Sequence, residues 1–157
     1  MRLIFLFFLC HSFLVSGQKI LFSFDTECPM SQKYVPVIQK IQSDFPKIAF
    51  QAIFTKWESD STITLFKSQY DFTLPYLIDK NNALLQSMDT EVVPEVFFFD
   101  EYNALLYRGS IDNWFYDLGK YRTKATEHYL IDAIELYLQG KCVERTATKA
   151  LGCIIEY

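Results

Sequence analysis

Residues 19–29 read KILFSFDTECP, and this stretch carries the strongest structural signal in the chain. The apolar and aromatic run from Lys19 to Phe24 is typical of a buried strand, and it stops at three polar residues. Cys28 and Pro29 follow, and proline suits the first turn of a helix because its missing N–H has no partner there. The sequence therefore predicts a cysteine at a strand-to-helix junction, where unpaired backbone N–H groups and the helix dipole favour the reactive thiolate.

The composition indicates one folded domain. The chain has 157 residues, of which 50% are hydrophobic and 22% charged, so a packed core is well supplied and disorder is not expected. The formal net charge is -4, and no basic patch is interleaved with aromatic residues. A nucleic-acid partner is therefore not expected.

The first 17 residues have the pattern of a signal peptide. Arg2 precedes an apolar run that extends to Val15, and small or modest residues lead to Gly17, after which we expect cleavage. A retained membrane anchor is the alternative, and membrane proximity is expected only through this segment. The predicted organisation is a signal peptide at 1–17 and one folded domain at 18–157, with export to the periplasm or the extracellular space.

The exported chain would carry three cysteines: Cys28, Cys142 and Cys153. Three is an odd number, so at most one intramolecular disulfide forms and one thiol remains. Export implies an oxidising compartment, or one in which dedicated partners manage thiols.

The hydrophobic pattern predicts an α/β fold with a mixed central sheet flanked by helices. Pro36 is expected to kink the first helix or to shift its start, Thr123 or Thr126 to cap the last helix, and Gly140 to end it. The expected elements are strands at 19–24, 48–55, 92–100 and 104–108, an extended segment at 74–78, helices at 58–70, 81–88 and 126–138, a helix that begins at Pro29, an irregular loop at 110–124 and a final strand at 151–155. This order is that of the thioredoxin fold.

The cysteine site lacks the second thiol of an ordinary dithiol motif. Such a motif would have a cysteine at position 31, where this chain has Ser31. Cys28 therefore acts alone, or its partner is a distant cysteine; an inert buried cysteine is the remaining alternative. Cys142 and Cys153 are 11 positions apart, so they are candidates for a structural disulfide, while Cys153 is also a candidate to fold back and resolve an oxidised Cys28.

Val93-Pro94 stands at the entrance of a strongly apolar strand, where proline is confined to an edge, a bulge or the first residue. In thioredoxin folds, a proline at this point follows a cis peptide bond, lies against the active cysteine and shapes a groove for an extended partner chain. We therefore expect a cis bond before Pro94. Arg108 is a candidate to stabilise the thiolate or to polarise a peroxide. Cys28, Cys153 and His128 are suitable ligand types for copper or zinc, but no local spacing supports a metal site.

Residues 25–36, DTECPMSQKYVP, resemble the cysteine-to-helix segment of bacterial redoxins in the peroxiredoxin-like, AhpC/TSA-related branch. Those proteins have one cysteine before a proline, followed by a tyrosine and a second proline in the helix. Residues 93–100, 106–113, 122–133, 140–141 and 152–154 resemble the same branch. The resemblance implies a thioredoxin fold with Cys28 as the redox-active residue.

The leading hypothesis is an exported redoxin that uses a single active-site cysteine for thiol–disulfide or peroxide chemistry. Its partner would be a thiol or disulfide redox protein, or a peroxide, and no cofactor is expected. A non-enzymatic thioredoxin-fold module for binding or copper handling is the alternative, and a structural domain without activity is the third hypothesis. The candidate catalytic residues are Cys28 and Cys153, and the candidate binding residues are Thr26, Pro29, Pro94 and Arg108.

Overall fold

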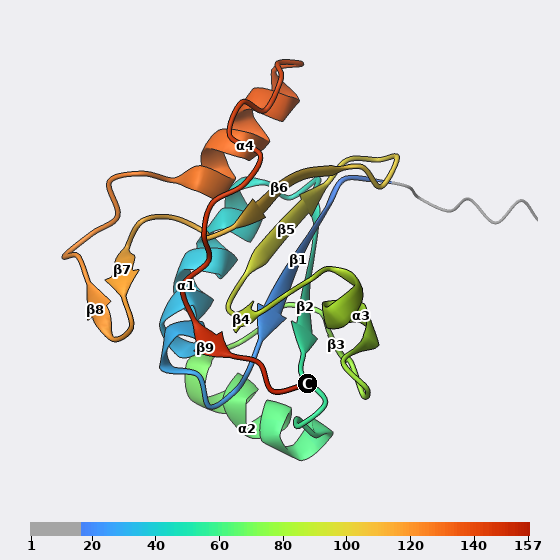
Figure 1. Cartoon of the computed structure of the whole chain (residues 1–157), viewed down its shortest axis with the longest axis vertical. Helices are drawn as coiled ribbons and strands as arrows, with labels where there is room; N and C mark the ends of the chain where they lie inside the picture. The colour runs from blue at the N-terminus through green and yellow to red at the C-terminus, as the bar shows by residue number, and fades with distance from the viewer. Residues whose placement is uncertain (1–16) are drawn as a thin grey trace, which may run out of the picture.

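The computed structural model describes residues 17–157, so the predicted signal peptide lies outside the described residues except for Gly17. Figure 1 shows a central sheet with helices packed around it. The elements are β1 (Lys19–Phe24), α1 (Pro29–Asp44), β2 (Ala49–Phe54), α2 (Asp60–Tyr70), β3 (Tyr76–Ile78), α3 (Ala83–Ser87), β4 (Val92–Val93), β5 (Val96–Phe99), β6 (Leu105–Gly109), β7 (Phe115–Asp117), β8 (Lys120–Tyr121), α4 (Tyr129–Leu138) and β9 (Cys153–Ile154).

The central sheet is mixed and has the strand order β3-β2-β1-β5-β6. Strands β1, β2 and β3 are parallel to one another, as the helical crossovers between them require. Strands β5 and β6 are antiparallel and form a hairpin next to β1. The predicted thioredoxin-like α/β fold is therefore confirmed.

The core lies on the sheet face that carries the alternate side chains Ile20, Phe22 and Phe24 of β1, which are fully buried. Helix α2 packs Phe66 against Phe24, with ring centroids 6.3 Å apart. Phe98 of β5 is paired with Ile20, so its side chain lies on the same face of the sheet. Helix α4 packs Tyr137 against Phe98 on that face. Because successive side chains of a strand point to opposite faces of the sheet, Ser23 of β1 lies on the other face.

The structure differs from the predicted elements in four places. The strand expected at 92–100 is divided at Pro94 into β4 and β5, and the loop expected at 110–124 contains the hairpin of β7 and β8. Helix α1 runs without interruption through Pro36. Helix α4 begins after His128 and not at a threonine cap, because Thr126 bonds Asn113 instead through its Oγ1 (2.9 Å) and its N–H (2.8 Å). Gly140 follows the end of the helix with a φ of 69°, as expected.

The C-terminal segment returns from α4 across the molecule, as Figure 1 shows, to the end of the sheet at which α1 begins. It first follows the outer edge of β6, where Arg108 N–H donates to the Thr146 carbonyl and Thr148 N–H donates to the Arg108 carbonyl, both at 3.0 Å. Gly109 has a φ of 132°, and a Cβ there would lie 2.2 Å from the Thr148 carbonyl oxygen. The segment then forms β9, which pairs with β4.

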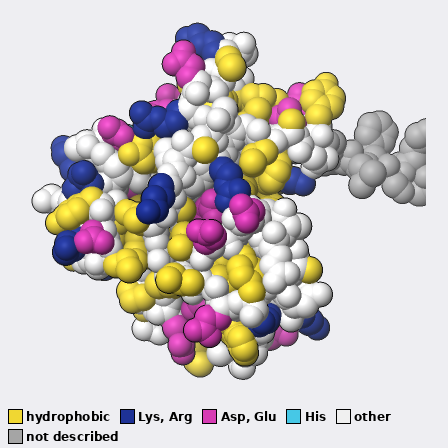
Figure 2. Space-filling model, in the orientation of Figure 1, with side chains coloured by type: hydrophobic (Ala, Val, Ile, Leu, Met, Phe, Trp, Pro, Cys, Tyr) yellow, Lys and Arg dark blue, Asp and Glu magenta, His cyan; other side chains and the backbone are white. Residues whose placement is uncertain are grey.

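The surface face drawn in Figure 2 carries acidic and basic side chains in small groups separated by apolar ones, with no continuous basic field. Within residues 17–157, no helix has the length and apolar character needed to span a membrane.

Candidate active site

Cys28 occupies the N-cap position of α1, directly after the turn that follows β1. Its carbonyl accepts a hydrogen bond from Gln32 N–H at 3.0 Å, and Pro29 is the first helical residue. The sulfur therefore lies at the positive end of a helix of 16 residues. This placement confirms the strand-to-helix junction predicted from the sequence.

Hydrogen bonds fix the turn between β1 and Cys28. The Asp25 carboxylate accepts Glu27 N–H at 2.9 Å, the Thr26 N–H donates to Glu58 Oε1 at 2.6 Å, and the Gln32 side chain donates to the Thr26 carbonyl at 2.9 Å. Thr26 thus contributes to the site through its backbone. Ser31, which stands where a dithiol motif has its second cysteine, is fully buried, and its hydroxyl has no hydrogen-bond partner among the described residues.

The structure joins Cys28 to Cys153 in a disulfide across 125 positions of sequence, with the two Cα atoms 6.1 Å apart. Cys142 is a free, exposed cysteine. The candidate structural disulfide between Cys142 and Cys153 is therefore wrong, because Cys153 lies against Cys28. Of the two arrangements left open by the sequence, a single thiol or a distant partner cysteine, the structure has the second, with Cys153 arriving on β9.

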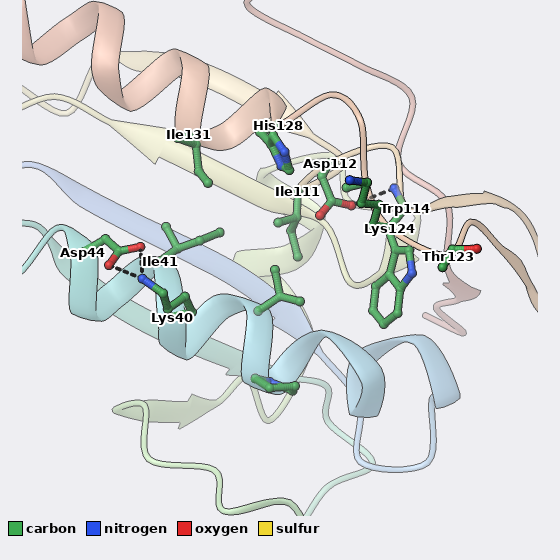
Figure 3. Close-up of a pocket in the computed structure, with 13 residues that line it drawn as sticks. Lys40, Ile41, Asp44, Ile111, Asp112, Trp114, Thr123, Lys124, His128 and Ile131 are labelled. Atoms are coloured by element: carbon green, nitrogen blue, oxygen red, sulfur yellow. Dashed lines mark hydrogen bonds and ion pairs between the residues drawn. The ribbon is translucent and has the colours of Figure 1, made fainter.

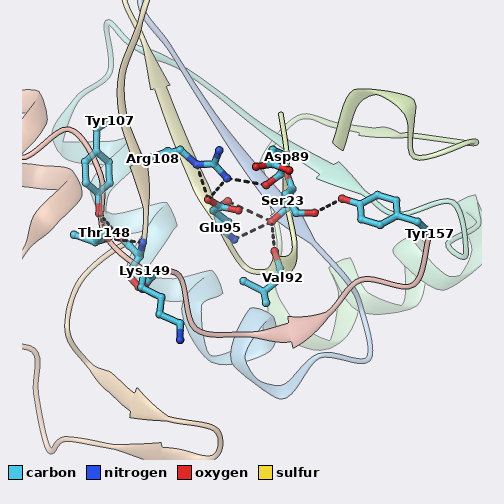
Figure 4. A network of polar contacts seen from close by, with 11 residues as sticks. Ser23, Asp89, Val92, Glu95, Tyr107, Arg108, Thr148, Lys149 and Tyr157 are labelled. Atoms are coloured by element: carbon cyan, nitrogen blue, oxygen red, sulfur yellow. Dashed lines mark hydrogen bonds and ion pairs between the residues drawn. The ribbon is translucent and has the colours of Figure 1, made fainter. Parts of the chain in front are cut away.

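The peptide bond between Val93 and Pro94 is cis, as predicted, and it stands beside the disulfide. The Val93 carbonyl oxygen lies 3.3 Å from Cys28 Sγ. Ser23 of β1 supports this loop from below: its hydroxyl donates to the Val92 carbonyl at 3.0 Å and accepts Glu95 N–H at 2.8 Å. Figure 4 shows the Ser23 hydroxyl between Val92 and Glu95, so that one side chain bonds the backbone on both sides of the proline turn.

Arg108 has a different role from the one predicted. Its Nε and Nη2 donate to Glu95 Oε1 at 3.0 and 2.8 Å, and Nη2 also donates to the Asp89 carbonyl at 2.9 Å (Figure 4). Glu95 is only 5% exposed, and burial raises the pKa of its carboxyl while Arg108 opposes that shift. Arg108 therefore neutralises a buried carboxylate behind the proline loop and does not line the cavity at Cys28.

A cavity of about 400 Å³ opens at the disulfide. Trp57, which is 66% exposed, forms part of its wall, and its indole N–H donates to the Glu156 carbonyl at 3.2 Å. The residues that line the cavity are Asp25, Glu27, Cys28, Thr55, Trp57, Val93, Cys153, Ile154, Ile155 and Glu156. Three of these lining residues are acidic and none is a lysine or an arginine, so the cavity is acidic.

Asp25 is the half-buried member of the three acidic residues that line the cavity, since Glu27 and Glu156 are exposed. Burial raises the pKa of the Asp25 carboxyl, and the negative charges of Glu58 and Glu27 raise it further, while hydrogen bonds from the backbone of Glu27 and Cys28 act in the opposite direction. A carboxylate here opposes formation of a second negative charge on Cys28. The helix dipole and Asp25 therefore have opposite effects on a free Cys28 thiol.

The two sulfurs differ in their access to solvent. Cys28 is 2% exposed, whereas Cys153 is partly exposed. An external thiolate therefore reaches Cys153 more readily, and its attack would release Cys28, the sulfur that the helix N-terminus stabilises as a leaving thiolate.

His128 lies away from this site. Figure 3 shows it with Lys124 and Trp114 around a second cavity between α1 and α4, whose other lining residues include Ile41 and Ile131. The structure therefore does not bring His128 to Cys28 and Cys153. Among the residues described, no three His, Cys, Asp or Glu side chains are grouped so that they could hold a metal ion.

Neither a protein-family model nor a curated protein sequence matches this chain. Several solved structures share its fold. A hypothetical protein from Sinorhizobium meliloti has a TM-score of 0.77 at 23% identity, over 90% of this chain and 80% of that one. A secreted disulfide oxidoreductase of Mycobacterium tuberculosis homologous to E. coli DsbE has a TM-score of 0.51 at 18% identity, over 57% and 66% of the two chains. StoA from Bacillus subtilis has a TM-score of 0.53 at 16% identity, over 59% and 72%.

These likenesses establish a thioredoxin fold, and at such identities they establish no more than the fold. Sequence reasoning identified Cys28, Cys153 and Pro94 as the centre of the site, and the structure brings these three together. It missed Ser23, whose signal was a single polar residue within the apolar run of β1. It also missed Trp57, for which the sequence offered no signal beyond an isolated tryptophan.

Proposed function

We propose that the protein is a thiol–disulfide oxidoreductase whose redox pair is Cys28 and Cys153. The observation that carries this proposal is the disulfide between a helix N-cap cysteine and a partly exposed cysteine beside a cis-proline loop. The likeness to disulfide oxidoreductases of the same fold supports it. The partner is a protein or peptide that carries a disulfide or a pair of thiols.

The reaction balances in two exchange steps. In the reduced protein, the Cys28 thiolate attacks one sulfur of a partner disulfide, forms a mixed disulfide and releases the other partner sulfur as a thiolate. The Cys153 thiolate then attacks Cys28 Sγ, re-forms the observed disulfide and releases the second partner thiolate. The partner gains two electrons and the protein loses two. A partner dithiol is oxidised when one of its thiolates attacks Cys153 Sγ and releases the Cys28 thiolate, after which the second partner thiolate attacks the partner sulfur of the mixed disulfide and releases the Cys153 thiolate.

Peroxide reduction has less support. A peroxidatic site benefits from a cation beside the thiolate, and Arg108, the residue expected to provide it, is bound to Glu95. The described lining of the cavity contains no other basic side chain. Copper handling is also less supported, since His128 lies at the second cavity.

We also propose that the protein is exported and that residues 1–17 are removed. The pattern of Arg2, an apolar run and small residues before position 18 supports this. N-terminal sequencing of the protein from its native host should begin at Gln18, and a sequence beginning at Met1 would contradict the proposal.

The test of the reaction is reduction of a synthetic peptide disulfide by the pre-reduced protein, followed by separation of the peptide thiols. Wild-type protein and Cys142→Ser should both reduce the peptide, and Cys28→Ser should not. Cys153→Ser should accumulate a mixed disulfide on Cys28, because the second step lacks its thiolate. Equal activity of wild type and Cys28→Ser would overturn the proposal.

A further inference from the structure

Strand β9 covers the edge of β4 by a short antiparallel pairing. Val92 lies opposite Ile154 and Val93 lies opposite Cys153, and the Ile155 N–H extends the contact by donating to the Glu91 carbonyl at 3.0 Å. Only two residues of each strand take part in the named pairing. An edge strand of this kind offers its backbone groups to any extended chain that fits beside it.

The path of β9 imposes a requirement on the residue before the cysteine. A Cβ on Gly152 would lie 2.1 Å from the Val93 carbonyl oxygen and 2.5 Å from its carbon. These are backbone atoms, held by the Ser23 bond to Val92 on one side and by the cis-proline turn on the other. A chain that delivers a cysteine to Cys28 along this path therefore needs glycine immediately before it.

The residues after the cysteine alternate between solvent and the molecule. Ile154 is 81% exposed, whereas Ile155 is 7% exposed and belongs to the core. The position directly after the cysteine is therefore free to vary, and the second position after it takes an apolar side chain.

The part of the tail that forms β9 is separate from the part that holds the tail to the domain. Thr148 is fixed against β6, where its Oγ1 accepts Ser110 N–H at 2.9 Å and contacts the Tyr107 hydroxyl at 2.6 Å. Beyond Lys149, the tail is held by the pairing with β4, by the disulfide and by the packing of Leu151 and Ile155 against the core. Bonds near the C-terminus add to these, such as Trp57 with the Glu156 carbonyl and the Tyr157 hydroxyl with the Thr90 carbonyl. Reduction of the disulfide removes the covalent contact between the tail and the rest of the domain.

The resemblance to thioredoxin folds implies that an extended partner chain binds beside the proline loop. We propose that β9, which occupies the β4 edge there, is an internal copy of the partner segment and gives way to it. The partner presents an extended segment with glycine before its reacting cysteine and an apolar residue two positions after it. This inference rests on the proposed function and names its partner class. The first exchange step then takes place on β4, and the Cys153 thiolate returns on β9 to release the partner.

The experiment uses the full exported chain with Cys142→Ser and Cys153→Ser, so that Cys28 is its single thiol. The probe is a synthetic peptide copy of residues 150–157 whose cysteine carries 2-nitro-5-thiobenzoate in a mixed disulfide. Attack of the Cys28 thiolate on the peptide sulfur forms the mixed disulfide and releases the coloured thiolate, whose absorbance gives the rate. The matched peptides carry Gly152→Val, Ile155→Asp or Ile154→Asp, and the corresponding glutathione reagent reports the reactivity of Cys28 without a peptide segment.

The unmodified peptide should react about tenfold faster than the Gly152→Val and Ile155→Asp peptides. The Ile154→Asp peptide should stay within about twofold of the unmodified one, because that side chain points to solvent. Equal rates for the Gly152→Val and unmodified peptides would overturn the binding surface while leaving the proposed reaction in place. A Cys28 that reacts with every reagent no faster than free cysteine would overturn both.

Discussion

The two cysteines of the disulfide come from regions with very different support. Cys28 is 2% exposed, begins a helix of 16 residues and follows a strand that pairs on both sides. Cys153 lies on a two-residue strand near the end of the chain, next to the 81% exposed Ile154. We call Cys28 the fixed sulfur and Cys153 the movable one, because a two-residue strand paired to β4 should open at lower free energy than a core strand and the helix that follows it.

This asymmetry separates the site from an ordinary dithiol motif, in which both cysteines belong to the same helix start. Here Ser31 occupies the helical position, and the second thiol is brought by the tail. In the proposed reaction, oxidation joins the tail covalently to the helix start, and reduction removes that link. The redox state of the pair and the accessibility of β4 are linked by the same segment.

The largest effect on this comparison should come from removing the movable sulfur. Cys153→Ser should lower the free energy of unfolding of the oxidised protein by about 4 kcal/mol, since the disulfide closes a loop of more than 100 residues in the unfolded chain. Urea unfolding followed by circular dichroism gives the value. Cys142→Ser is the matched control and should unfold like wild type, and a similar loss in both variants would contradict the pairing.

Arg108→Ala should lower the free energy of unfolding by about 3 kcal/mol at pH 7, because Glu95 next to the proline loop would be left as a buried charge without its partner. Burial raises the pKa of Glu95 in the folded protein, so the folded state holds this proton more tightly than the unfolded state. The loss should therefore be small below the ordinary carboxyl pKa and should grow as the pH rises through and above it.

Urea unfolding of wild type and Arg108→Ala at a series of pH values measures that dependence. Arg145→Ala removes an arginine from an exposed ion pair with Glu127 and serves as the control, with an expected change below about 1 kcal/mol. A deficit in Arg108→Ala that stays constant across the carboxyl range would show that Glu95 is not the group responsible.

Gly152→Ala should destabilise the position of β9 and leave the helix start at Cys28 unchanged. The added Cβ collides with the Val93 carbonyl when β9 is in place, so the oxidised form should lose about 2 kcal/mol relative to the reduced form. The reduction potential should then rise by about 40 mV. Equilibration with glutathione buffers measures it, Ile154→Ala is the control at an exposed position, and an unchanged potential in Gly152→Ala would mean that β9 does not follow the described path.

The smallest expected effect concerns the fixed side. Asp25→Asn removes a negative charge next to the reduced Cys28, so the midpoint of its alkylation against pH should fall by about half a unit. The Cys142→Ser, Cys153→Ser background isolates this thiol. An upward shift of the midpoint would indicate that Asp25 assists the thiolate instead of opposing it.

The fixed side could be predicted from the sequence because its determinants are local. An apolar run, a polar turn and Pro29 specify a strand, a junction and a helix start within 11 residues. Pro94 was recognisable from its position at a strand entrance, although the strand was drawn without the break that the proline causes. The same local signals placed Cys28 correctly.

The sequence makes Cys153 a candidate partner of Cys28 but does not fix its pairing, because its position depends on contacts between distant segments. The path of the tail is set at the β6 edge by Gly109 and Thr148, and no local pattern shows that this edge is free to receive it. The sequence is therefore compatible with a disulfide from Cys153 to Cys142 or to Cys28, and the fold makes the second. Arg108 was misassigned for a similar reason, since Glu95 becomes its neighbour only when β5 and β6 pair.

The central claim is that Cys28 and Cys153 form one two-electron couple. It is tested most directly by equilibrating the protein across a series of glutathione redox buffers, labelling free thiols with light and disulfide thiols with heavy alkylating reagent, and mapping the labels by mass spectrometry. We expect Cys28 and Cys153 to change label together at one potential while Cys142 stays light throughout. A heavy label on Cys142 and Cys153 together, with Cys28 light at every potential, would contradict it.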